Sequence, residues 1–388
     1  MVDFELNPEQ ADLRSMLQDF VRRQVAPVAR DLEHSGRYPE EIVEAMKGLG
    51  LFGILVPEEY GGIDLDGVSY AIVFEELSRG WMGISGVLGS HSMSTMLLAK
   101  HGTPEQRRRW LPDLASGARR SGLALTEPGA GSDLQGITTT ATRDGEDYIV
   151  QGSKTWITNA RHADPLPVLV KTDPRAEPRH RGMSILYVEK TTPGYSVSRD
   201  IGKLGYKGPE SCEIAFESAR VPAANLLGGV EGRGLKQALS VLEFGRINVA
   251  GRAVGVAQAA YEKALAYSQQ RHAFGNPISS FQAVQLKLAD LATEVQAARL
   301  LVWWAASRVG GRRADVETGM AKYFASEVAL RSALTSMRIH GGYGYSDEFE
   351  VERLYRDAPL MAIGEGTNDI LRTVIARGLL KESASLPD

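Results

Sequence analysis

The stretch Leu125-Thr126-Glu127-Pro128-Gly129-Ala130-Gly131-Ser132-Asp133 decides the fold, because the pattern of the sequence changes around it. From Ser121 to Gly232 the apolar runs are short and rich in β-branched and aromatic residues, and the turns between them hold eight of the seventeen prolines. Such runs are typical of strands. An all-β module is therefore predicted, with strands near Ile137–Thr142, Tyr148–Val150, Trp156–Thr158, Val168–Lys171, Met183–Val188, Tyr195–Ser198 and Glu213–Phe216.

Helical patterns precede this module. Asn7 is a suitable N-cap and Pro8 a suitable first residue for a helix whose apolar positions follow at helical spacing. Similar patterns continue to the start of the module and predict an N-terminal helical domain over residues 1–120. They lie at Pro39–Leu49, Tyr70–Leu77, Met93–His101 and Thr103–Leu111.

Long helices are predicted after the β module, because only Pro277 interrupts the chain between Arg233 and Ala358. Apolar positions there keep helical spacing between charged ones, which is typical of a bundle. The order helix, strand, helix predicts an α+β multi-domain protein. Its domains are expected at 1–120, 121–232 and 233–388.

Composition excludes several classes of protein. The 388 residues carry a formal charge of −4 with 24% charged and 43% hydrophobic residues, which is not the profile of a nucleic-acid-binding protein. The single cysteine, Cys212, allows neither an internal disulfide nor a cysteine-based zinc site, so no metal site is expected. No apolar stretch approaches the roughly 18 residues of a membrane span, and Met1–Gln10 lacks a basic and then apolar leader. These features favour a cytoplasmic protein without a membrane span.

Common catalytic and nucleotide-binding motifs are missing from the sequence. It has no Gly-x-Gly-x-x-Gly, no Gly-Lys-Ser/Thr phosphate loop, no His-Glu-x-x-His and no Gly-x-Ser-x-Gly. What remains is a set of glycine-rich and polar clusters. The glycines that flank Ala130 could bring backbone N–H groups close to an anion or a planar ring, or could form a tight surface turn.

The other clusters also allow two interpretations each. Trp156 and Thr158 share one face of a strand and could cover a ring system or belong to the core. Arg271 at a helix end could bind phosphate or balance the helix dipole. Glu365, between Gly364 and Gly366, could be a functional carboxylate or a dipole partner of the next helix.

Taken together and in order, these segments resemble the acyl-CoA dehydrogenase family over essentially the whole chain. The resemblance implies an N-terminal helical domain, a middle β-barrel and a C-terminal four-helix bundle, with FAD as cofactor. It implies that the flavin ring contacts Leu125, Thr126, Gly131, Ser132, Trp156, Ile157 and Thr158, and that Thr367 and Asn368 close on it. It also implies that the FAD of a partner subunit is reached by Arg271, Phe274, Phe281, Gln282, Gly341 and Gly342.

By the same resemblance, Glu365 is the catalytic base that removes the α-proton while flavin N5 accepts the β-hydride. Its backbone N–H is expected to polarise the thioester carbonyl, and Gly366 lets the backbone approach the substrate. Exclusion of water should raise the pKa of Glu365. Some members with branched substrates have their base at the position of Gly245. Because glycine has no side chain that could act as a base, this supports the assignment of Glu365. Ser132, Glu243 and Arg246 match positions near the CoA chain.

The resemblance implies a dehydrogenase of fatty-acid β-oxidation that makes trans-2-enoyl-CoA and passes electrons to an electron-transferring flavoprotein. A homotetramer arranged as a dimer of dimers is expected. Met82 and Ile84 lie where glutaryl-specific members bind the distal carboxylate, so a dicarboxylyl substrate is disfavoured. Two alternatives stay open: a flavin-dependent oxidase or monooxygenase on the same fold, and a non-enzymatic acyl-carrier-binding scaffold.

Overall fold

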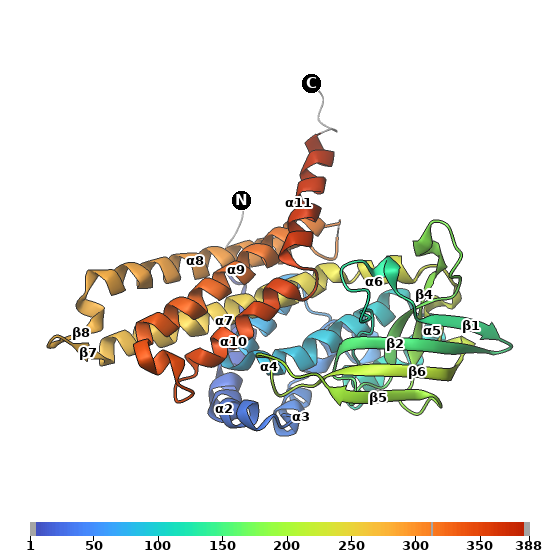
Figure 1. Ribbon diagram of the computed structural model, residues 1–388, viewed down its shortest axis with the longest axis horizontal. Coiled ribbons are helices and arrows are strands. Elements are labelled where there is room, and N and C mark those ends of the chain that lie inside the picture. Colours follow the sequence, from blue (N-terminus) through green and yellow to red (C-terminus); the bar gives the residue numbers. More distant parts are fainter. Residues whose placement is uncertain (1–4, 312, 384–388) are drawn as a thin grey trace.

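The computed structural model describes residues 5–311 and 313–383 and has the expected order of helices, sheet and helices (Figure 1). The first helix begins as predicted: the Asn7 side chain accepts a hydrogen bond from the backbone N–H of Gln10, and Pro8 is the first helical residue. This cap satisfies a backbone donor that the helix itself cannot. The N-terminal helices are α1 (Pro8–Phe20), α2 (Ala26–Ser35), α3 (Glu40–Gly48), α4 (Gly67–His101) and α5 (Pro104–Ala115).

Helix α4 is the central helix of the N-terminal part. It joins the two segments predicted separately at Tyr70–Leu77 and Met93–His101, because the chain resumes its helix after a kink at Trp81. Most of its residues, including the charged Glu75 and Glu76, are buried, so α4 has no face open to solvent. A helix that is buried all round must be covered on all sides, and α4 accordingly packs against α1, α5, α7 and α8.

The middle part forms a six-stranded sheet in the described residues, with strand order β4-β3-β1-β2-β6-β5. The β1–β3 pair is parallel and the other pairs are antiparallel. Strand β2 unites two predicted strands and is bulged twice against β6, between Val150 and Gly152 and between Lys154 and Ile157. The strands are β1 (Thr140–Asp144), β2 (Asp147–Thr158), β3 (Leu166–Lys171), β4 (Met183–Val188), β5 (Tyr195–Asp200) and β6 (Ser211–Pro222).

Long helices form the C-terminal part, and α7, α8, α9 and α10 lie side by side along the length of the molecule (Figure 1). Pro277 lies in a small hairpin between α7 and α8. The elements are α6 (Gly234–Leu239), α7 (Leu242–Gln270), β7 (His272–Ala273), β8 (Asn276–Pro277), α8 (Gln282–Ala306), α9 (Asp315–His340), α10 (Val351–Ile363) and α11 (Asn368–Ser383).

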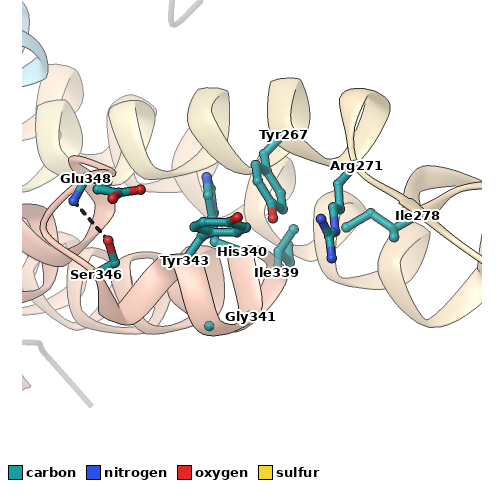
Figure 2. A pocket seen from close by; sticks show the side chains of 10 residues that line it. Tyr267, Arg271, Ile278, Ile339, His340, Gly341, Tyr343, Ser346 and Glu348 are labelled. Atoms are coloured by element: carbon teal, nitrogen blue, oxygen red, sulfur yellow. Dashed lines mark hydrogen bonds between the residues drawn. The ribbon is translucent and has the colours of Figure 1, made fainter.

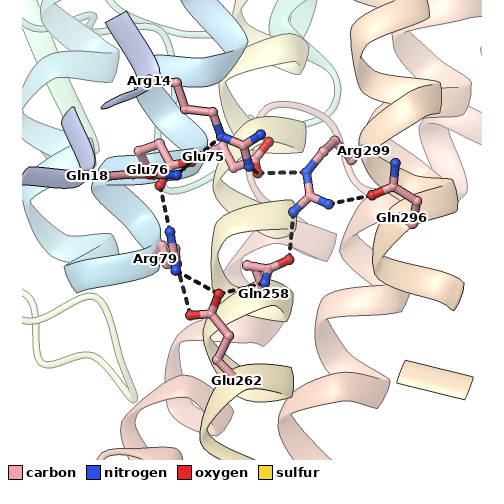
Figure 3. Close-up of polar contacts among 9 residues, drawn as sticks. All are labelled: Arg14, Gln18, Glu75, Glu76, Arg79, Gln258, Glu262, Gln296 and Arg299. Atoms are coloured by element: carbon pink, nitrogen blue, oxygen red, sulfur yellow. Dashed lines mark hydrogen bonds and ion pairs between the residues drawn. The ribbon is translucent and has the colours of Figure 1, made fainter. Parts of the chain in front are cut away.

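Buried charges tie the N-terminal helices to the bundle (Figure 3). Glu75 of α4 accepts a hydrogen bond of 2.8 Å from Arg299 Nε of α8, and the adjacent Glu76 accepts one of 2.7 Å from Arg14 Nε of α1. A buried carboxylate is tolerated only when such partners satisfy it. The network therefore fixes how α1, α4 and α8 are placed relative to one another.

The sheet and the β7–β8 hairpin lie at opposite ends of the long axis (Figure 1). Helices α4 and α7 pack against each other between these ends, and one apolar core runs through both. Within the described ranges, none of the helices combines the length and the apolar composition needed to cross a bilayer.

Candidate active site

Glu365 lies in the short turn between α10 and α11, and its backbone is left-handed, with φ of 54°. A non-glycine residue rarely adopts this conformation, because its Cβ crowds the backbone. Gly366 follows with φ of 90°, where glycine carries no such penalty. The surrounding contacts must hold this strained turn, and strain of this kind is concentrated at functional sites.

Helix α9 supplies those contacts. Lys322 is fully buried, and its Nζ donates to the carbonyl oxygen of Gly366 at 2.8 Å and to Oδ1 of Asn368 at 3.1 Å. Asn368 also donates from Nδ2 to Ser326 Oγ at 3.0 Å. Burial lowers the pKa of Lys322 to about 8, with the charge of Glu365 opposing this. The turn that carries Glu365 is thus fastened on its C-terminal side. Thr367 caps α11 by accepting from the N–H of Ile370.

The Glu365 carboxyl group faces α7 and α4. Its Oε2 lies 2.9 Å from the point that a Cβ on Gly245 would occupy, and Met93 Cε lies 2.8 Å from that point. The side chain is half-buried. Burial raises the pKa of Glu365, and the charges of Arg252, Arg246 and Lys322 oppose that rise. A carboxylate with a raised pKa is a stronger base than one in water.

Glu243 and Arg246 lie one turn apart at the start of α7 and face the same segment, as their spacing predicts. Arg246 Nη1 donates to Asp315 Oδ1 at 2.7 Å, and Glu243 Oε1 accepts from the N–H of Ala314 at 3.1 Å. Together they hold the start of α9 against α7, close to the turn of Glu365.

The end of strand β2 presents an exposed indole. Trp156 has φ of 62° and is 56% exposed, so it does not belong to the core. Ile157 is buried in the core of the sheet and pairs with Cys212 of β6. Thr158 is half-buried. Just beyond, Asn159 Nδ2 donates to the carbonyl of Val87 at 2.9 Å, which joins the end of β2 to α4.

A buried ion pair fastens the segment Leu125–Glu127 to β2. Lys154 Nζ donates to the carbonyl of Leu125 at 3.2 Å and to Glu127 Oε1 at 2.8 Å. Burial opposes ionisation of Glu127, but hydrogen bonds from Lys154 and Thr139 and the Lys154 charge hold its pKa at about 2. Burial lowers the pKa of Lys154 to about 8. Both groups are therefore charged at neutral pH. Leu125 and Thr126 of this segment are half-buried, and Gly131 and Ser132, a few residues further along the chain, are exposed.

Arg271 and the glycines Gly341 and Gly342 line a cavity of about 580 Å³ at the end of the bundle (Figure 2). The Arg271 guanidinium lies 6.0 Å from the centre of the Tyr343 ring. The adjacent hairpin presents Phe274, which is 94% exposed and has φ of 52°. Its ring contacts that of Phe281 edge-on, and Gln282 is exposed at the start of α8.

The predicted residues therefore form two groups in one chain. One group comprises the end of β2, the segment at 125–132 and, across α4, the turn of Glu365. The other lies beside the β7–β8 hairpin at the far end of the molecule (Figure 1). The structure does not bring these two groups together within a single chain.

Sequence reasoning missed several residues that position the site. Lys154 and Glu127 pair across 27 positions, and Lys322 reaches a turn 44 positions away. One local signal was available for Lys322: its neighbours one turn away, Thr318, Gly319, Ala325 and Ser326, are all small. A lysine on such a face is buried by close helix packing and needs acceptors.

Comparison with known proteins identifies the class. Three family descriptions match the chain in order: "Acyl-CoA dehydrogenase, N-terminal domain" over residues 7–118, "Acyl-CoA dehydrogenase, middle domain" over 122–219 and "Acyl-CoA dehydrogenase, C-terminal domain" over 232–380. The chain belongs to the acyl-CoA dehydrogenase family, and it is an oxidoreductase. The predicted family and its three-part fold are confirmed.

Individual relatives cover nearly the whole chain. A probable acyl-CoA dehydrogenase of Bacillus subtilis (strain 168) is 44% identical over 383 residues, which are 98% of this chain and 100% of the relative. Butyryl-CoA dehydrogenase from Megasphaera elsdenii has a TM-score of 0.94 at 36% identity and covers 98% of this chain and 100% of its own. A chain in the structure described as "Electron transferring flavoprotein of Acidaminococcus fermentans: Towards a mechanism of flavin-based electron bifurcation" has a TM-score of 0.94 at 38% identity, with 98% and 100% covered.

Proposed function

We propose that this protein catalyses the FAD-dependent α,β-dehydrogenation of an acyl-CoA thioester to the trans-2-enoyl-CoA. The observation that carries the proposal is Glu365: a half-buried carboxylate on a strained turn, with its pKa raised, in a member of the acyl-CoA dehydrogenase family. A thioester α-proton is a weak acid, so its removal needs a base that is placed and partly desolvated. Glu365 meets both conditions.

The residues present fit FAD. The exposed Trp156 indole offers an uncovered aromatic face for a planar ring, and the adjacent Thr155 N–H donates at 3.0 Å to the carbonyl of Thr126, in the segment that continues to the exposed Gly131 and Ser132. At the far end, the Arg271 guanidinium beside Gly341 suits a pyrophosphate, because its fork of donors matches phosphate oxygens. When bound, the flavin supplies the acceptor for the β-hydride.

A second copy of the chain is part of the proposal. Because the group beside the β7–β8 hairpin lies away from the end of β2 and the turn of Glu365 within one chain, Arg271, Phe274, Phe281, Gln282, Gly341 and Gly342 serve the FAD of a partner subunit. We propose a homotetramer arranged as a dimer of dimers, with the cofactor site completed between subunits.

In this proposal, residues of the chain itself have separate roles in the reaction. Glu365 takes the α-proton at its carboxylate, and its backbone N–H donates to the thioester carbonyl oxygen, which stabilises the charge that develops there. Gly366 and the Thr367–Asn368 turn keep this backbone in position. Ser132, Glu243 and Arg246 contact the CoA chain, and the Asp315 carboxylate that accepts from Arg246 holds its guanidinium in place.

The electron acceptor, the substrate class and the metabolic role are proposed from the similar proteins. The similarity to a chain in a structure whose description names an electron transferring flavoprotein supports such a flavoprotein as the electron acceptor. The similarity to butyryl-CoA dehydrogenase supports an acyl-CoA substrate and a role in fatty-acid β-oxidation. We further propose a cytoplasmic location and domains at 1–120, 121–232 and 233–388.

Anaerobic mixing of the FAD-loaded protein with butanoyl-CoA tests the proposal. The flavin absorbance band should bleach, and trans-2-butenoyl-CoA should appear in equal amount. Reduced flavin exposed to air should reoxidise slowly. Rapid reoxidation would favour the oxidase, and a protein that takes up no FAD would favour the acyl-carrier-binding scaffold.

A further inference from the structure

Arg252 of α7 is a buried cation without an acidic partner. It is 8% exposed, and no carboxylate of the described residues lies within ion-pair distance of it. Its Nη2 makes one long hydrogen bond of 3.4 Å, to the carbonyl of Ser85, and its Nε has no partner. The guanidinium is held between the rings of Phe74 and Tyr206, at 5.5 and 5.9 Å from their centres.

Asn248, one turn earlier on α7, is directed to the same place. It is 2% exposed and its Oδ1 has no hydrogen-bond partner. A Cβ on Gly89 of α4 would overlap Nη2 of Arg252 and would lie 2.5 Å from Nδ2 of Asn248. Two buried polar side chains of α7 thus converge at one point on α4, and glycine at position 89 leaves the room for them.

This point lies one helical turn from the proposed base. Gly245, which faces the Glu365 carboxyl, precedes Asn248 by three residues, or about 4.5 Å along α7. Side chains on a helix lean toward its N-terminus, so the guanidinium of Arg252 reaches back toward Asn248. The Arg252 charge is also the largest that acts on Glu365. An acyl chain whose α-carbon lies beside Glu365 and that extends along α7 by one helical turn would come to Asn248 and to the guanidinium that converges with it at Gly89.

Two other buried arginines, on α7 and α8, are paired with carboxylates. Arg299 binds Glu75 at 2.8 Å and Arg246 binds Asp315 at 2.7 Å. A buried guanidinium with unsatisfied donors is costly, and a charged acceptor removes that cost. A carboxylate is suited to Arg252, because it accepts from the guanidinium fork at both oxygens. Nδ2 of Asn248 offers the carboxylate a further donor, whereas the unpartnered Oδ1 is an acceptor and does not bind it.

We propose that Arg252 and Asn248 bind a carboxylate at the far end of the acyl group, so that the substrate class is a short dicarboxylyl-CoA thioester of four or five carbons. This rests on the function proposed above. The C2 proton goes to Glu365, the C3 hydrogen leaves with two electrons as hydride to the bound flavin, and the distal carboxylate is unchanged. The sequence disfavoured such a substrate because Met82 and Ile84 offer no cation, and both are buried and apolar; the proposal departs from that expectation because the cation comes from α7 instead.

Binding measured without turnover tests the proposal. The FAD-loaded Glu365→Gln protein is titrated calorimetrically with glutaryl-CoA and with pentanoyl-CoA, which has the same chain length and no carboxylate. Glutaryl-CoA should bind at least about 10-fold more tightly. Adding Arg252→Gln should lower the affinity for glutaryl-CoA by about 30-fold or more relative to the affinity for pentanoyl-CoA. Arg252→Lys in its place should restore part of the preference for glutaryl-CoA. Equal affinities, or an equal effect of Arg252→Gln on both thioesters, would overturn the proposal.

A matched control is Arg353→Gln on α10, which removes another buried arginine with unpartnered nitrogens. It should leave the ratio of the two affinities unchanged. FAD content and thermal melting establish that each variant is folded. Flavin bleaching by the wild-type protein separates the two claims: bleaching by pentanoyl-CoA without a preference for glutaryl-CoA refutes the dicarboxylyl site alone. Binding of both thioesters with no bleaching by either refutes the dehydrogenase function.

Discussion

Oε2 of Glu365 lies 2.9 Å from the position that a Cβ atom on Gly245 would occupy. The base proposed on the α10–α11 turn therefore rests directly against the backbone of α7. Glycine at 245 permits this approach, and every larger residue would compete with the carboxyl group for the same space.

Gly245→Ala should slow flavin reduction by an acyl-CoA without loss of stability. Alanine normally stabilises a helix interior by up to about 1 kcal/mol over glycine, but here its methyl group would displace Glu365 or Met93 by a few tenths of an ångström. A small misplacement of a base lowers the rate, so a loss of about 10-fold is expected. Stopped-flow bleaching measures it, with Gly48→Ala, where nothing lies within 4 Å, as control. An unchanged rate would show that Glu365 has room to move.

Lys322→Met should loosen the turn that carries Glu365. It leaves the carbonyl of Gly366 without its donor, at a cost of about 1–3 kcal/mol. The thermal midpoint and the rate of flavin reduction should both fall. Lys287→Met, on the exposed face of α8, should change neither. If the two variants behaved alike, the buried lysine would not hold the site.

Glu127→Gln should destabilise the protein by about 3–5 kcal/mol, because it leaves Lys154 buried without a counter-charge. The pKa of Glu127 is depressed to about 2 from 4.5. The contribution of Glu127 to the free energy of unfolding is therefore present above about pH 4.5 and is lost as the pH falls toward 2. Urea unfolding at pH 7 and at pH 3 should show a smaller difference between wild type and variant at the lower pH. The exposed Glu146→Gln serves as control, and a variant as stable as wild type at pH 7 would contradict the role of the pair.

The rate of flavin reduction should depend on the ionisation of Glu365. A base acts only when deprotonated, and burial raises the pKa of Glu365 above 4.5. The rate should therefore decline on acidification with an apparent pKa above 4.5. A single-turnover pH profile measures this, and a rate that stays flat down to pH 4.5 would contradict a raised pKa.

Local patterns predicted much of the fold. The Asn7–Pro8 helix start and the strand Met183–Val188 appear where the sequence places them. The segments Tyr148–Val150 and Trp156–Thr158 were predicted as separate strands but belong to the single strand β2. The polar residues between them continue the ladder with β6 through two bulges, and such pairing is not encoded in local alternation.

The residues of the candidate site also differ in how far local sequence predicts them. The local sequence around Glu365, Gly366 and Thr367 predicted a turn before a helix, but it left Glu365 open as a functional carboxylate or a dipole partner. The assignment of Glu365 as the base came from the family resemblance and stays a prediction. Arg252 and Lys322 could not be predicted, because the burial of a charge inside a helix depends on which helix packs across it. The Cβ-free surface of Gly89 has meaning only once α4 lies against α7.

Single-turnover reduction of the Glu365→Gln protein tests the central claim most directly. The variant keeps the size of the side chain and loses the base. It should bind FAD and acyl-CoA as the wild type does, while flavin bleaching should slow by about 100- to 10,000-fold. Bleaching at a rate close to wild type, with FAD and thioester bound, would contradict the assignment of Glu365 as the base.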